Sequence, residues 1–371
     1  RALVDSADEL PLASLKYCLE KSKITYADIN HIAYNLDSKD RLEHGINVDS
    51  GHKIHENSWG TESGEKLFYQ KNLNVIDKLS DLFGKNIADI FHVVKHHVAH
   101  AAGAFYSSGF SSSAILVVDG IAEHYSTWLG VGNDTEIKNY YEIDYPNSLG
   151  FVCEKISEFL GFSEYDAEKV MGLASYGNYK NEIGSMGKII DVAENGNFVV
   201  DNDILLFRTG DFSQLEKLFG VSKRKKGEEL TAKHQDIAAS LQHITEKIVL
   251  HLATKLKDLS QSDNLCLAGG TALNVVSNAK LVESNLFKNI YIQPEANDAG
   301  GAIGAAFYVH ANILKLGRPE PINHAYLGPD FSNEYILSVL QKHPELSFEF
   351  KKNIAKETVK LLTDGNLIGW F

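Results

Sequence analysis

The chain has 371 residues and a formal net charge of −13, from 49 acidic and 36 basic residues. This length is too great for one ordinary hydrophobic core and suits two similar halves. The acidic balance argues against non-specific nucleic-acid binding, which needs a basic surface, so we expect no nucleic-acid partner. No apolar run approaches the roughly 20 residues of a membrane span, so we expect no membrane insertion.

The three cysteines, Cys18, Cys153 and Cys266, are far apart, and each lies in an apolar periodic segment. They cannot form a disulfide framework and are typical of reduced core thiols in a cytoplasmic protein. The sequence shows no signal peptide and begins with Arg1 rather than Met. We therefore expect the natural protein to begin upstream of Arg1.

The first hundred residues predict helices and strands around one polar segment. Ser63 fits a helix N-cap, and Gly84 fits a helix end. The polar segment over 37–60, with several His, Asp and Gly, predicts a surface loop or a substrate lid. The expected elements are a helix over 10–22, a strand over 31–35, a helix over 63–83 and a strand over 90–94.

The stretch from His96 to Gly120 organises the rest of the prediction. His96 and His100 are four residues apart, so on a helix their side chains lie on one face. The small residues after them allow that helix to pack closely against a neighbour. The apolar run 114–118 predicts a strand buried on both faces, and Asp119 follows it, where open α/β sheets gather ligands. Two imidazoles and a carboxylate together would bind a divalent transition metal.

Each of these features also has an ordinary structural explanation. A His pair at this spacing is more often a surface pair or a hydrogen-bonded core pair than a ligand set. Asp119 followed by Gly120 is also a common tight-turn signal. The metal site is favoured because His100 opens into small apolar residues rather than a solvated face. A second acidic candidate, Asp298, lies downstream in a glycine-rich turn.

The middle of the chain predicts a hairpin followed by helices. Strands are expected over 125–131 and 135–143, and Ser148 begins a helix that ends near Leu160. Residues 166–177 place Lys169 and two acids beside a small-residue turn. Residues 179–231 are polar and weakly periodic, which is typical of a solvated loop or helix. A long helix is expected over 231–257.

Two strand, glycine-turn and helix units then follow in succession. Gly269 and Gly270 follow the strand 264–267, and Gly300 follows the strand 290–292. Backbone amides in such turns, together with a helix N-terminus, make natural phosphate cradles. Neither turn matches the P-loop or dinucleotide fingerprint, and close helix–strand packing is the alternative for each. Two turns on one sheet edge favour nucleotide binding, while Asp298 is either an N-cap or a second metal carboxylate.

These motifs together resemble those of the NodU/CmcH-type O-carbamoyltransferases. The order of the motifs and their approximate spacing agree with that family from residue 90 to 330. The matching stretches are His96 to Ala102, Val117 to Gly120, Ser148 to Phe151, Lys169 to Gly177, Leu267 to Gly270 with Leu273-Asn274, Asp298 to Ala302, and Tyr326 to Pro329.

The resemblance implies an α/β fold of the actin/sugar-kinase-like type, with two related halves and mixed central sheets. It implies a first half over 1–145 that lacks its N-terminal strands, and a second half over 146–345 with nucleotide-binding glycine turns. Residues 346–371 are then a linker and the beginning of a YrdC-like domain, cut off at its start.

The resemblance also implies a reaction. In that family, the YrdC-like domain makes carbamoyl-adenylate from carbamoyl phosphate and ATP. The first domain then passes the carbamoyl group to a hydroxyl of a small-molecule or sugar acceptor, beside a divalent metal that is iron in the best-known relatives. The expected partners are these small molecules, and a homodimer is a further expectation.

By position, the metal ligands would be His96, His100, Asp119 and Asp298, with His96 and His100 as catalytic residues. The residues that line the adenylate would be Lys169, Met171, Gly172, Gly269, Gly270, Asn274 and Gly300. One departure concerns the family's acid two residues before the motif lysine, which is Ala167 here. The other is the absence of the family's opening strands.

Two other functions remain as alternatives. The first is a sugar-kinase-like, ATP-dependent phosphotransferase on the same fold, although no opening phosphate loop is recognisable. The second is a non-catalytic module that holds nucleotide without turnover. The acceptor itself carries no general motif. The segments 37–60 and 179–231 are the candidates for acceptor contacts.

Overall fold

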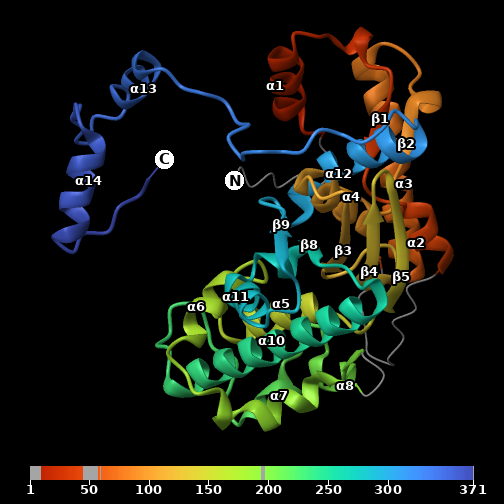
Figure 1. Cartoon of the computed structure of the whole chain (residues 1–371). Helices are drawn as coiled ribbons and strands as arrows, with labels where there is room; N and C mark the ends of the chain where they lie inside the picture. The colour runs from red at the N-terminus through yellow and green to blue at the C-terminus, as the bar shows by residue number, and fades with distance from the viewer. Residues whose placement is uncertain (1–9, 45–56, 59, 194–196, 371) are drawn as a thin grey trace. The chain divides into compact units, whose positions relative to one another are not determined.

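The computed structural model describes residues 10–44, 57–58, 60–193 and 197–370 (Figure 1). Arg1, the middle of the segment 37–60, and Phe371 lie outside the described residues. The chain divides into two compact units, 1–325 and 326–371. Within the described residues, no helix combines the length and apolar character that crossing a lipid bilayer requires.

The N-terminal part of the first unit follows most of the expected elements. The two strands pair in parallel, with Ile32 beside Phe91. The bounds are α1 Leu12–Ser22, β1 Ile32–Tyr34, α2 Ser38–His44, α3 Glu62–Phe83 and β2 Phe91–Val93, with short 3-10 turns at Tyr26–Asp28 and Ala88–Ile90.

Two details of this part differ from the prediction. The segment expected as a loop over 37–60 contains the helix α2, which is short and strongly polar, so no apolar periodicity announced it. The N-cap of α3 is Thr61 rather than Ser63, because the Thr61 hydroxyl accepts the Gly64 N–H at 3.1 Å. Gly84 ends α3 in the left-handed region, as expected.

The first unit is built on a five-stranded sheet of order β5-β4-β3-β8-β9. β4 is antiparallel to β3 and β5, whereas β3, β8 and β9 are parallel. The mixed sheet confirms the α/β class. The strands are β3 Ser112–Val118, β4 Tyr125–Asn133, β5 Glu136–Asp144, β8 Asn264–Ala268 and β9 Asn289–Ile292.

The five-stranded sheet contains strands from both sides of residue 145, the expected border between the two halves. This border follows β5 directly, but β3 on one side of the border pairs with β8 on the other, with Leu116 beside Leu267. Parallel pairing joins segments about 150 residues apart, which local periodicity does not encode.

Helices cover both faces of this sheet (Figure 1). Along β3, Leu116 packs into a core with α5 (Leu149–Phe159) and α10 (Ala232–Ser260), while Val117 packs into a core with α4 (His96–Ser108). The strand is therefore buried on both faces, as its continuous apolar run predicted.

The helix α12 (Gly301–Tyr308) packs directly on α4, and the contact depends on a glycine. A Cβ at Gly304 would lie 1.9 Å from the Ala99 carbonyl oxygen, so only glycine permits this approach. The expected close packing of the helix after His100 is thus confirmed. This contact brings the start of α12, and with it Asp298, beside α4.

The described part of the segment 179–231 has more buried side chains than its polar composition predicted. Met186, Phe198, Leu215 and Phe219 are buried in the core that α10 covers. The elements are too short to show a period. They are a 3-10 turn at Tyr179–Asn181, α7 Ile183–Ile189, β6 Ile190–Val192, β7 Phe198–Val200, α8 Asn202–Leu205 and α9 Ser213–Phe219.

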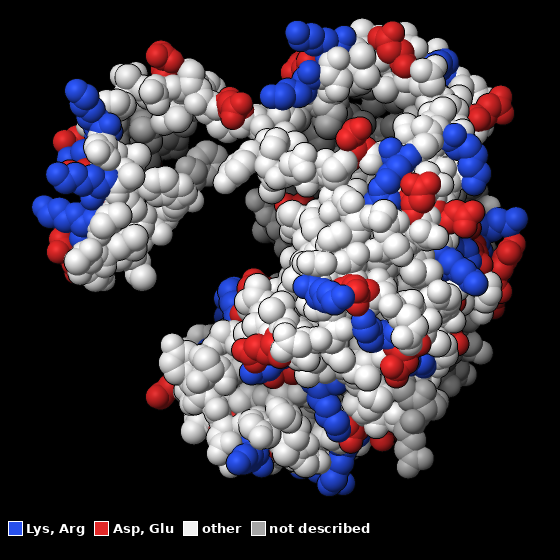
Figure 2. All heavy atoms as spheres, in the orientation of Figure 1, with Lys and Arg blue, Asp and Glu red and all other residues white. Residues whose placement is uncertain are grey.

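The remaining elements of the first unit are α6 Ala167–Ala174, a 3-10 turn at Gly270–Leu273, α11 Val275–Glu283, a 3-10 turn at Asp298–Gly300 and a π-helical turn at Val309–Ile313. On the face seen in Figure 2, acidic and basic side chains are interspersed over this unit. The second unit contains α13 Asn333–Leu340 and α14 Ile354–Thr363.

Candidate metal centre

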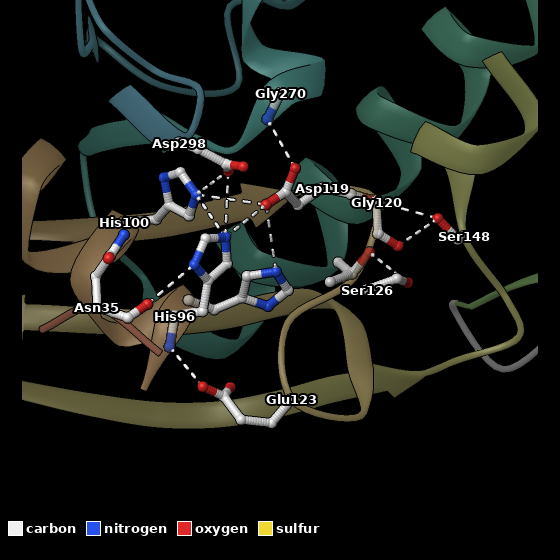
Figure 3. A network of polar contacts seen from close by, with 12 residues as sticks. Asn35, His96, His100, Asp119, Gly120, Glu123, Ser126, Ser148, Gly270 and Asp298 are labelled. Atoms are coloured by element: carbon white, nitrogen blue, oxygen red, sulfur yellow. Dashed lines mark hydrogen bonds and ion pairs between the residues drawn. The ribbon is translucent and has the colours of Figure 1, made fainter. Parts of the chain in front are cut away.

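Four polar side chains meet at the carboxyl edge of the parallel strands (Figure 3). Asp119 follows β3, and Asp298 follows β9 by six residues, at the start of the 3-10 turn before α12. His96 and His100 lie on one face of the first turns of α4. The metal-ligand set predicted from the sequence is therefore brought together in space.

The ligand atoms of these four residues all lie within 4.8 Å of one another. His96 Nε2 is 3.3 Å from Asp119 Oδ2 and 3.3 Å from Asp298 Oδ1. His100 Nε2 is 3.4 Å from the first of these oxygens and 3.5 Å from the second. The two Nε2 atoms are 3.2 Å apart. All four groups thus point toward one small volume.

The site is buried on one side and open on the other. His96, His100 and Asp119 are buried, whereas the side chain of Asp298 is 78% exposed. Burial raises the pKa of Asp119, but hydrogen bonds from His100 and His96 outweigh it and hold the pKa well below its usual range. Hydrogen bonds from the same two imidazoles lower the pKa of Asp298.

The imidazoles respond in the opposite direction. Burial lowers the pKa of His96, but hydrogen bonds to Asp119 and Asp298 more than compensate and raise it well above its ordinary value. The pKa of His100 is raised for the same reasons. The carboxylates therefore stabilise positive charge at this point, whether that charge is a proton or a cation.

The donor set fits a divalent transition metal. Two imidazole nitrogens and two carboxylate oxygens are ligands that Fe²⁺, Zn²⁺ and related ions accept. Donor separations of 3.2–3.5 Å match neighbouring ligands around one ion whose bonds are about 2.1 Å long. The open side at Asp298 would leave room for a further ligand.

Three groups hold these candidate ligands in place, and the sequence prediction missed two of them, Asn35 and Glu123. The Asn35 carbonyl lies 3.1 Å from His96 Nδ1, the Gly270 N–H donates to Asp119 Oδ1 at 3.1 Å, and Glu123 accepts the His96 backbone N–H at 2.9 Å. Asn35 follows a strand, as Asp119 does, and that position could have flagged it. Each of the three contacts involves a backbone atom, which no side-chain pattern shows.

The neighbouring His97 is not one of the four. It is fully buried, and its Nε2 lies 3.8 Å from Asp119 Oδ2. Burial lowers the pKa of His97 to about 4. Its ring contacts Tyr125 edge to face, so it belongs to the packing beneath the site.

Of the residues expected to line an adenylate, some lie near one another and others do not share a described contact. Met171 and Asn274 line one small cavity of about 30 Å³ with Gln242 and Cys153. Gly269 and Gly270 follow β8, and the Gly270 N–H already binds Asp119. Lys169 is exposed and pairs with Asp166 at 2.7 Å.

The last two expected residues lie in different environments. Gly172 lies in α6 with open space where a Cβ would be. Gly300 is buried, and its N–H donates to the Asn297 carbonyl at 3.0 Å.

A larger cavity of about 370 Å³ opens beside the four ligands. His96 and Asp298 line it directly, so a molecule in this cavity would contact the proposed metal position. The other lining residues are Tyr34, Asn35, Leu36, Arg41, Ile121 and Ala122.

Comparison with known proteins identifies the family. A family model described as the carbamoyltransferase N-terminus matches residues 4–307, which include all four candidate ligands. The chain belongs to this carbamoyltransferase family. The resemblance that the motifs predicted is therefore confirmed.

Two curated proteins are similar to this chain over almost its whole length. An uncharacterised protein of Synechocystis sp. is 32% identical over 379 residues, which cover 97% of this chain and 61% of that protein. Nodulation protein NolNO of Sinorhizobium fredii is 30% identical over 370 residues, covering 99% of this chain and 52% of that protein.

Among solved structures, full-length HypF in its phosphate- and nucleotide-bound form is 14% identical, with a TM-score of 0.39, over 67% of this chain and 50% of that chain. The chain spans 61% and 52% of the length of the two curated relatives named above.

Proposed function

We propose that this chain carries the transfer centre of an O-carbamoyltransferase, which moves a carbamoyl group from carbamoyl-adenylate to an acceptor hydroxyl. The observation that supports this most is the meeting of His96, His100, Asp119 and Asp298 beside a glycine turn and an open cavity. The family match over the same residues supports it independently.

A divalent ion at this position, proposed to be iron, would lower the cost of removing the acceptor's hydroxyl proton and offset developing negative charge. The chain's own residues hold the candidate ligands in position. Asp119 is fixed by Gly270, and His96 is fixed by Asn35. The cavity lined by His96 and Asp298 has room for an acceptor hydroxyl close to these groups.

The proposed step exchanges one bond for another. The acceptor oxygen forms a bond to the carbamoyl carbon, and the bond from that carbon to the phosphate oxygen breaks. AMP leaves with the electron pair of that bond, and the hydroxyl proton passes to water. The glycine turns at Gly269 and Gly300 are proposed to lie beside the leaving group, where the absence of a side chain allows its close approach. Lys169, Met171, Gly172, Gly270 and Asn274 are proposed to complete the adenylate contacts.

The proposal is tested by incubating the chain with carbamoyl-adenylate and a panel of hydroxyl acceptors, followed by mass spectrometry. We expect an acceptor that gains one carbamoyl group, with stoichiometric AMP. The His100→Ala variant should lose this transfer while the exposed His343→Ala variant retains it. Full transfer by the His100→Ala variant would contradict the assignment. In a second incubation with ATP in place of carbamoyl-adenylate, a phosphorylated acceptor would indicate a kinase instead.

A further inference from the structure

A buried glutamate outside the ligand set joins two of the segments that build the site. Glu123 lies in the turn between β3 and β4 and is completely buried. Its Oε1 atom accepts the backbone N–H of His96 at 2.9 Å and that of Asp37 at 3.0 Å. Figure 3 shows the first of these contacts beneath the His96 ring.

The contact with His96 fixes the start of the ligand helix. His96 is the first residue of α4, and the residue before it, Lys95, makes no side-chain cap bond. The first amides of a helix need acceptors from elsewhere, and a carboxylate is favoured there by the helix dipole. Glu123 supplies that acceptor from another part of the chain, so it sets where the ligand helix begins.

The contact with Asp37 fixes a second group that acts on the same ring. Asp37 lies two residues after Asn35, whose carbonyl oxygen is 3.1 Å from His96 Nδ1. A carbonyl can only accept, so Nδ1 must carry a proton in this contact. This leaves Nε2 as the nitrogen that faces Asp119 and Asp298.

We propose that Glu123 is a positioning residue for the transfer centre: one carboxylate oxygen holds both the backbone of His96 and the strand end that orients its ring. Glu123 does not touch the ligand position itself. It acts through His96, by keeping Nε2 directed at the other three ligands. The inference rests on the proposed metal centre, but its effect on the His96 ring is present without an ion.

The test uses Glu123→Ala, Glu123→Gln and a control, Asp201→Ala. Asp201 also accepts two backbone N–H groups, at 3.0 and 3.1 Å, but in α8 and outside the site. Zn²⁺ affinity is measured by calorimetry, thermal unfolding by circular dichroism, and the His96 ring N–H by nitrogen-15 NMR, in the metal-free and Zn²⁺-loaded protein.

We expect Glu123→Ala to weaken Zn²⁺ binding by about 10- to 100-fold, as loss of a group that orients a ligand does. Glu123→Gln keeps an acceptor oxygen and should lose less affinity. Asp201→Ala should lower the unfolding temperature without changing affinity. In the metal-free protein, the His96 Nδ1–H should exchange with water faster in Glu123→Ala than in the wild type.

Three results would separate the claims. A folded Glu123→Ala variant with unchanged Zn²⁺ affinity and unchanged His96 Nδ1–H exchange would overturn the role of Glu123. If Glu123→Ala does not fold, Glu123→Gln decides the question. Wild-type Zn²⁺ affinity and wild-type His96 Nδ1–H exchange in Glu123→Gln, with the unfolding temperature lowered as much as in Asp201→Ala, would then overturn the role of Glu123. A wild-type chain that binds no Zn²⁺ would overturn the metal centre instead, while the exchange measurement would still decide the role of Glu123.

Discussion

At the scale of single residues, a buried lysine away from the site gives a test of the core. Lys155 on α5 is only 1% exposed, its Nζ donates to the Thr209 carbonyl at 2.7 Å, and it lies 3.8 Å from the centre of the Phe212 ring. Burial lowers the pKa of Lys155 to about 8. The folded chain therefore releases this proton at a lower pH than the unfolded chain does.

The sign of the pH dependence follows from that difference. Between about pH 8 and the ordinary lysine value of about 10.4, the unfolded chain binds more protons, so the free energy of unfolding rises with pH. We expect this rise, on the order of 3 kcal/mol over the window, in the wild type and not in Lys155→Met. Urea unfolding at several pH values measures it, and parallel profiles for the two proteins would contradict the burial of a titrating Lys155.

The convergence of His96, His100 and Asp119 could be predicted from sequence because each stands at a position with a geometric meaning. His96 and His100 share a helix face by their spacing, and Asp119 follows a buried strand. Glu123 could not be predicted in the same way, and the position of Asn35 after a strand indicates where it lies but not what it contacts. Their contacts use backbone atoms of residues that are distant in the sequence, and the spacing of side chains does not reveal them.

At the scale of elements, the turn after β8 depends on one backbone conformation. Gly269 has φ of +87°, and a Cβ there would lie 2.3 Å from the Val118 carbonyl oxygen. Val118 precedes Asp119, and Gly270 donates to that carboxylate. This glycine therefore keeps the turn close to the strand end that carries a ligand.

We expect Gly269→Ala to lower the free energy of unfolding by at least about 1–3 kcal/mol, from backbone strain alone, and to weaken metal binding. Gly172→Ala is the matched control, since that position is helical with nothing near the added Cβ, and it should stabilise by up to about 1 kcal/mol. Urea unfolding compares them. Equal stability of both variants and the wild type would contradict the described turn.

Long periodic elements were predictable, whereas the short elements within polar segments were not. The helices α3 and α10 appear close to their expected bounds. Among the described residues, the helix α2 and the elements between α6 and α10 have three to seven residues each. Such lengths are too short to show a helical or strand period, so buried residues such as Phe198 and Leu215 looked like parts of a solvated segment.

At the scale of the whole molecule, the site exists because parallel pairing gathers distant strand ends. β3 pairs with β8, and β8 with β9, so their carboxyl ends share one edge. The close approach of α12 to α4 at Gly304 then sets Asp298 against His96 and His100. The sequence predicts the separate strands and turns, and the pairing of β3 with β8 places their carboxyl ends in one sheet.

One ion is proposed to bind between two residues of α4, the residue after β3 and the residue at the start of the turn before α12. The most direct measurement is anomalous diffraction from crystals of the chain prepared with Fe²⁺. We predict one peak about 2.0–2.3 Å from the Nε2 atoms of His96 and His100 and from carboxylate oxygens of Asp119 and Asp298. A peak elsewhere, or none with the four side chains still converging, would contradict it.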